Sequence, residues 1–190
     1  MTAGAVRLIL TGDSGCGKTR VCQAAADGLR DRGWSVAGVV CPGVWMADQK
    51  VAIDALDLRS GEVRRLAERA EMGDAAVGPA TRGWHFHVGA LAWCNSLLAN
   101  AGDPDLLVID ELGPLELEEG EGLMQGMVAA DAGRFRVGLL VVRPRLLALA
   151  RTRWPDARIV GLDSPTEVPR TVNEILAVAG MQRASARGSE

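Results

Sequence analysis

The chain has 190 residues, of which 48% are hydrophobic and 24% are charged, a balance typical of a globular protein rather than a disordered one. This length is sufficient for one α/β domain with its own core. The formal net charge of −3 argues against general nucleic-acid binding, which depends on clustered Lys and Arg. No apolar run reaches the roughly 18 residues expected of a membrane-spanning helix.

The four cysteines show neither CxxC spacing nor association with a histidine cluster, which argues against a zinc site. We expect them to be reduced thiols. The N-terminus enters a short apolar run without the charged and apolar regions of a signal peptide. Together these features predict a cytoplasmic protein.

Short apolar runs alternate with helical periodicity along the chain. The patterns predict strands over 6–11, 35–40, 84–88, 105–109, 137–142 and 158–161, and helices over 18–30, 91–98, 119–130, 146–153 and 165–179. Between them we expect a β-hairpin over 51–66, a mobile loop over 67–83 and a frayed tail over 181–190. Strands alternating with helices indicate a mainly parallel sheet covered on both faces. The expected fold is therefore a three-layer α/β domain over residues 1–180 with an appended β-hairpin.

A glycine-rich loop lies between the first expected strand and the first expected helix. It matches GxxxxGK[ST] and reads Gly12-Asp13-Ser14-Gly15-Cys16-Gly17-Lys18-Thr19. In such a loop the backbone N–H groups point inward, and the helix that follows adds the positive end of its dipole. Lys18 is expected to reach the β- and γ-phosphates, and the Thr19 hydroxyl to bind Mg²⁺. We predict that the loop and the adjacent Arg20 bind a nucleoside triphosphate.

Two adjacent acids follow the apolar run 105–109. The run has the form of a Walker B strand, which would bring Asp110 to the carboxyl edge of the sheet as a ligand of Mg²⁺, direct or through water. Glu111 is then placed to orient or deprotonate a water molecule, a task that needs a carboxylate near the metal but not on it. We interpret Glu111 and Lys18 as catalytic residues, with a structural role for Glu111 as the alternative.

The segment Asp110-Glu111-Leu112-Gly113-Pro114-Leu115-Glu116-Leu117, combined with the phosphate loop, resembles the THEP1-type nucleoside-triphosphatases. The resemblance extends over residues 6–178. It implies a RecA-like fold and slow, Mg²⁺-dependent hydrolysis of ATP, GTP and other triphosphates to the diphosphate and phosphate, with loose base selectivity. Where such proteins often have a Thr-Pro-Glu-Val-Arg-like stretch, this chain has Gly43 and Trp45 in place of the Glu and the Arg.

Several weaker signals stay open. Glu116 could be catalytic or could stabilise the loop after Pro114 as an exposed acid. His85 and His87 would share one face of a strand, where they could bind a metal or simply sit half-buried. One of Arg143 and Arg145 could act as an arginine finger, and Trp45 or Trp84 could stack on the nucleobase.

Two other functions compete with hydrolysis. A kinase would pass the γ-phosphoryl group to a small acceptor, with residues 41–88 as a lid over it. A nucleotide-dependent switch or assembly factor would bind a protein partner in one nucleotide state. An acid directly after Asp110 favours water activation and therefore the hydrolase.

Overall fold

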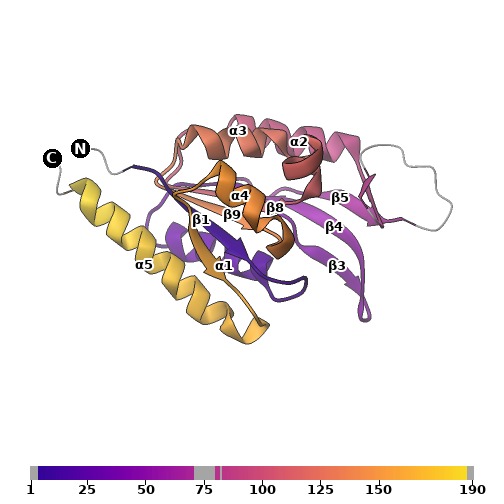
Figure 1. Cartoon of the computed structure of the whole chain (residues 1–190), viewed down its shortest axis with the longest axis horizontal. Helices are drawn as coiled ribbons and strands as arrows, with labels where there is room; N and C mark the ends of the chain where they lie inside the picture. The colour runs from indigo at the N-terminus through magenta and orange to yellow at the C-terminus, as the bar shows by residue number, and fades with distance from the viewer. Residues whose placement is uncertain (1–3, 71–79, 82, 188–190) are drawn as a thin grey trace.

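The computed structural model describes residues 4–70, 80–81 and 83–187, and in this part of the chain ten strands form one sheet. Figure 1 shows the sheet between two layers of helices. Along the sheet the strand order is β10-β1-β9-β8-β2-β4-β5-β7-β6, with β3 paired to β4. The five strands from β10 to β2 are parallel to one another, and the strands beyond β2 are antiparallel.

The parallel strands are separated in sequence by helices. Their bounds are β1 (Val6–Thr11), β2 (Val36–Val40), β8 (Leu106–Leu112), β9 (Val137–Val142) and β10 (Arg158–Gly161). The antiparallel strands are β3 (Gly43–Met46), β4 (Gln49–Asp57), β5 (Val63–Arg69), β6 (Ala80–Thr81) and β7 (Trp84–Phe86). The helices are α1 (Lys18–Arg30), α2 (Val88–Ala99), α3 (Met124–Ala132), α4 (Leu147–Arg153) and α5 (Val168–Arg187). Three short turns complete the set: the π-helical η1 (Leu115–Glu119) and the 3₁₀ helices η2 (Pro144–Leu146) and η3 (Pro165–Glu167).

The core consists of two apolar layers, one on each face of the sheet. In β8, for example, Leu106 and Val108 pack in the layer under α1 and α5, whereas Leu107 and Ile109 pack in the layer under α2, α3 and α4. Figure 1 shows α2 and α3 above the sheet and α1 and α5 below it. Both faces are covered because side chains alternate along each strand, which explains the continuous apolar runs in the sequence.

The predicted three-layer α/β fold is confirmed, and so is the β-hairpin, as β4 and β5. The antiparallel part is larger than the sequence indicated: β3 was missed, since Gly43 and the exposed end of its hairpin give no alternating apolar pattern. Part of the predicted loop over 67–83 is strand, in β5 and β6, and residues 71–79 and 82 lie outside the described residues.

Two further expectations need correction. The helix expected over 119–130 is displaced, since 115–119 form the π-helical turn and α3 begins at Met124. The tail expected from residue 181 is helical as far as Arg187, because α5 continues; residues 188–190 lie outside the described part.

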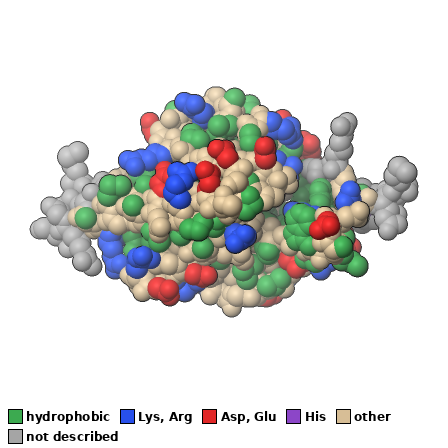
Figure 2. Space-filling view, turned by 90° about the horizontal axis from the view of Figure 1, so that it is seen from below, with side chains coloured by type: hydrophobic (Ala, Val, Ile, Leu, Met, Phe, Trp, Pro, Cys, Tyr) green, Lys and Arg blue, Asp and Glu red, His purple; other side chains and the backbone are tan. Residues whose placement is uncertain are grey.

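Charges are mixed on one face of the molecule. On the face seen in Figure 2, Lys and Arg side chains lie among Asp and Glu side chains rather than in one continuous basic stripe. Within the described residues, no helix is both long enough and apolar enough to cross a membrane.

Candidate nucleotide-binding site

The phosphate loop turns sharply between β1 and α1. Gly17, the residue before α1, has φ 103°, a left-handed conformation that costs little only for glycine. A Cβ atom on Gly12 would lie 2.1 Å from the carbonyl oxygen of Leu162, so that this position also admits no side chain. With both glycines in place, α1 begins at Lys18 directly beneath the loop, and its first N–H groups are free to bind an anion.

Lys18 lies over the loop that it follows. Its Nζ donates to the carbonyl oxygens of Gly12, at 2.6 Å, and Asp13, at 2.7 Å, and lies 3.7 Å from the Sγ of Cys16. These two acceptors are neutral carbonyl oxygens, so neither is a counter-ion for the ammonium group. A phosphate oxygen is a stronger acceptor for these N–H groups than a carbonyl.

Asp110 is buried within β8, next to α1. Its Oδ2 accepts a hydrogen bond of 2.9 Å from the Cys41 N–H. The Thr19 hydroxyl is close enough to lower the pKa of the same carboxyl group. Burial raises the pKa of Asp110 to about 6, and the charge of Glu111 adds to the rise, whereas the Cys41 N–H, Thr19 and Lys18 oppose it. A buried carboxylate beside a hydroxyl is a hard oxygen pair that fits Mg²⁺, which usually takes one or two protein ligands together with waters and phosphate oxygens.

Glu111 follows Asp110 within the strand rather than after it, which corrects the expected strand end at residue 109. The pairing of β8 with β9 shifts register between Ile109 and Leu112, and Glu111 has φ 84°, unusual for a residue other than glycine. Because of this bulge, both adjacent acids line the same cavity instead of pointing to opposite faces of the sheet. Holding a glutamate at this φ costs of order 1–3 kcal/mol.

Arg143, the first residue after β9, holds the Glu111 carboxylate. Its Nε donates to Oε1 of Glu111 at 3.0 Å, and its Nη2 makes a shorter contact with the same oxygen. Arg145 instead approaches Glu118 of η1, at 3.5 Å. The sequence did not distinguish Arg143 from Arg145. In the structure Arg143 contacts Glu111, one of the two acids predicted to lie at the site, whereas Arg145 contacts neither of them.

Glu116 has a clear structural position. It is 8% exposed, and its two oxygens accept hydrogen bonds of 2.8 Å from the N–H groups of Gly113 and Leu123. Burial raises its pKa, although these N–H groups favour the charged form. The carboxylate thus ties the π-helical turn to the start of α3, and the expectation of an exposed acid was wrong.

These groups surround one cavity of about 680 Å³ along the carboxyl edge of the parallel strands. It is lined by seven of the eight loop residues, by Arg20, Asp110 and Glu111, and by residues of the β3–β4 hairpin. Cys16 is the exception, since its thiol is buried under α1. The cationic lining side chains are Lys18, Arg20, Lys50, Arg143 and Arg145, and the acidic ones are Asp13, Asp110 and Glu111. The cavity is therefore locally positive, although the chain has a negative net charge.

The other open residues divide into two groups. Trp45 lines the cavity and Trp84 does not, although Trp84 lies under the Lys50 ammonium. His85 lies in β7, and His87 faces Glu68 at 3.7 Å. Among the described residues no three His, Cys, Asp or Glu side chains form a metal-binding group, so nothing favours the metal interpretation of the histidines. Sequence reasoning missed Lys50, whose rarity as one of two lysines was the available signal.

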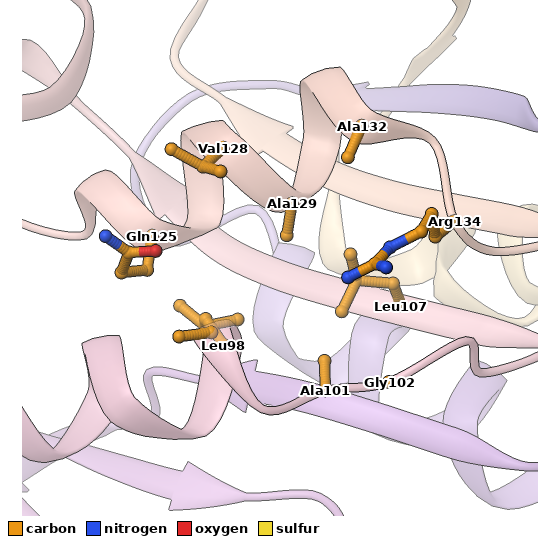
Figure 3. A pocket seen from close by; sticks show the side chains of 10 residues that line it. Leu98, Ala101, Gly102, Leu107, Gln125, Val128, Ala129, Ala132 and Arg134 are labelled. Carbon is orange, nitrogen blue, oxygen red and sulfur yellow. The ribbon is translucent and has the colours of Figure 1, made fainter.

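A second, smaller hollow of about 80 Å³ opens between α2 and α3. Figure 3 shows Leu98 of α2 facing Gln125, Val128 and Ala129 of α3, with Arg134 at one side. Its sheet residue, Leu107, lies near the amino end of β8, whereas Asp110 lies near the carboxyl end. This hollow contains neither an acid nor a nucleophile and is separate from the phosphate loop.

A glycine-rich loop between a strand and a helix, with a buried acid on a neighbouring parallel strand, defines a P-loop nucleoside-triphosphate-binding protein. Comparison with known proteins supports this class. A family model described as NTPase matches residues 7–127. The nucleoside-triphosphatase THEP1 of Methanopyrus kandleri is 29% identical over 126 residues, which are 66% of this chain and 67% of that protein. That of Thermofilum pendens is 30% identical over 132 residues, which are 68% and 70% of the two chains.

The fold also has a solved counterpart. The solution structure of a human cancer-related nucleoside triphosphatase aligns with a TM-score of 0.65 at 21% identity, covering 91% of this chain and 98% of that one. The chain belongs to the NTPase family that includes the THEP1 nucleoside-triphosphatases, as its resemblance to them implied.

The position of Glu116 leads to a prediction. Glu116→Ala should lower the free energy of unfolding by roughly 2–4 kcal/mol, because two buried N–H groups lose their acceptor. Denaturant unfolding would measure this, with the exposed Glu121→Ala as the matched control that should change stability little. A Glu116→Ala protein of parental stability that binds nucleotide but does not turn it over would instead make Glu116 catalytic.

Proposed function

We propose that this member of the family is a Mg²⁺-dependent hydrolase that converts nucleoside triphosphates to the diphosphate and inorganic phosphate. The proposal rests on one observation: the side chains of Lys18, Thr19, Asp110 and Glu111 all line the same cavity. The excess of cationic side chains around that cavity suits a polyanionic ligand.

In this proposal the chain's own groups divide the work. The loop N–H groups and Lys18 hold the β- and γ-phosphates, and Arg20 extends the positive surface beside Thr19. Thr19 and Asp110 would hold Mg²⁺, which when bound neutralises charge on the phosphate oxygens. Glu111 accepts a proton from water as the water oxygen bonds to the γ-phosphorus and the bond to the bridging oxygen breaks.

The contact between Arg143 and Glu111 supports this assignment. A guanidinium on Oε1 fixes the carboxylate in one orientation and leaves Oε2 as the proton acceptor. We therefore propose Arg143 as the residue that positions Glu111, and assign Arg145 to the surface pair with Glu118.

Loose base selectivity is part of the proposal. Most of the charged groups of the cavity belong to the phosphate loop, the acid pair and the residues that follow β9, and these positions suit contacts with phosphates rather than with a base. The cytoplasmic location and the possibility of a protein partner stay predictions. The net charge of −3, together with the mixed charges on the face shown in Figure 2, supports the expectation that general nucleic-acid binding is not part of the function.

A phosphate-release assay tests the function directly. The purified protein should release phosphate from ATP, GTP, CTP and UTP at comparable rates with Mg²⁺, and release should stop when EDTA removes the metal. Release that begins only after a small acceptor molecule is added would contradict hydrolysis and favour a kinase.

Glu111→Gln tests the role of the second acid. The amide keeps the size of the side chain but cannot accept the proton, so turnover should fall by roughly 10²- to 10⁴-fold while triphosphate binding persists. Single-turnover kinetics and a binding titration on the same preparation would measure both quantities. Hydrolysis at the parental rate would assign water activation to another group.

A further inference from the structure

The chain contains 19 arginines but only two lysines, and both lysines line the same cavity. The first, Lys18, belongs to the phosphate loop. The second, Lys50, lies at the start of β4 on the β3–β4 hairpin, outside every motif that the sequence offers.

The sheet order places Lys50 opposite the phosphate loop. Along the carboxyl edge the loop follows β1, Arg143 follows β9, the two acids lie in β8 and Cys41 follows β2. The hairpin comes next, because β4 pairs with β2 and β3 pairs with β4. Lys18 and Lys50 therefore approach the cavity from the two sides of the Asp110–Glu111 pair.

The Lys50 side chain lies against an aromatic ring and occupies the space beside a glycine. Its Nζ lies 5.3 Å from the centre of the Trp84 ring, a cation–π distance. A Cβ atom on Gly43 would lie 2.7 Å from the Cε of Lys50, so the glycine leaves the space that the lysine stem occupies. Trp45, the cross-strand partner of Lys50, lines the cavity beside it.

No carboxylate in the described part of the chain neutralises the charge of Lys50. Among the described carboxylates none lies within 4.0 Å of its ammonium, whereas Arg143 and Arg145 at the same cavity each have an acidic partner. An indole ring attracts a cation without accepting the three N–H groups in conventional hydrogen bonds. Lys50 is thus a positioned cation whose donors are available to a ligand in the cavity.

We propose that Lys50 forms a second phosphate-binding subsite, on the hairpin side of the acid pair. The ligand is a phosphate group, because a compact ammonium binds this tetrahedral dianion as a point charge. Its source is either the terminal phosphate of the bound triphosphate or the phosphate of a second molecule. The proposal rests on the proposed function, since it uses the same nucleotide site.

Equilibrium binding to Lys50→Gln separates the two sources. Loss of one charged hydrogen-bonding partner should weaken the phosphate contact about 10-fold or more. If the terminal phosphate is the ligand, the affinity for MgATP falls and the affinity for MgADP stays unchanged. If a second molecule is the ligand, both nucleotides bind as before, but inorganic phosphate binds more weakly to the MgADP-loaded protein. Either result supports the subsite.

Three variants control the experiment. Arg64→Gln removes a cation that also lies over a tryptophan, Trp93 at 4.6 Å, but outside the cavity, and should change neither affinity. Lys50→Arg keeps the charge and should restore part of the binding. Gly43→Ala keeps the lysine but displaces its stem, and should reproduce part of the loss.

Unchanged binding of MgATP, MgADP and inorganic phosphate in Lys50→Gln would overturn the subsite while leaving the proposed function intact. A parental protein that binds neither nucleotide would overturn the proposed function and the subsite with it.

Discussion

Electrostatic attraction between a polyphosphate and the start of α1 is the interaction on which the rest of the site depends. The protein has a negative net charge, so it can bind such a ligand only by gathering N–H dipoles and a few cations at one place. The turn from β1 into α1 does this without any long basic segment. Gly12 and Gly17 are required there, the first by the nearby Leu162 carbonyl and the second by its left-handed backbone.

Strand β8 and the residue after β9 supply the acid pair and the arginine that the phosphate loop does not contain. The bulge in β8 turns two consecutive acids toward one cavity, one buried against Thr19 and the other half-buried against Arg143. The strained backbone of Glu111 is fixed by the residues that flank it, since Ile109 is paired with both β2 and β9 and Leu112 is paired with Val142 of β9. The two carboxylates therefore have different environments, as expected of a metal ligand and a proton acceptor.

Much of this arrangement follows from sequence patterns. The apolar runs of β1, β8 and β9 are buried on both faces and are evident without a structure, and the phosphate loop has a strict spacing. Local patterns could not predict β3, whose residues are half-buried or exposed, or the π-helical turn, which depends on the contacts of Glu116 with Gly113 and Leu123.

Contacts between residues far apart in the sequence could not be predicted either. The sequence could not distinguish Arg143 from Arg145, because both follow β9. In the structure Arg143 contacts Glu111 of β8 and Arg145 contacts Glu118 of η1. The rarity of lysine could single out Lys50 but could not place it at the cavity. Its position there results from the pairing of β3, β4 and β2, which brings the hairpin to the sheet edge.

A titration of Lys18→Ala with MgATP tests the central claim most directly, with the parental protein and the exposed Arg151→Ala variant as references. If the loop and its ammonium hold the triphosphate, Lys18→Ala should show no tight binding, Arg151→Ala should bind normally, and the unfolding temperature should not change greatly. Parental affinity in a folded Lys18→Ala protein would contradict the assignment of the triphosphate to this loop.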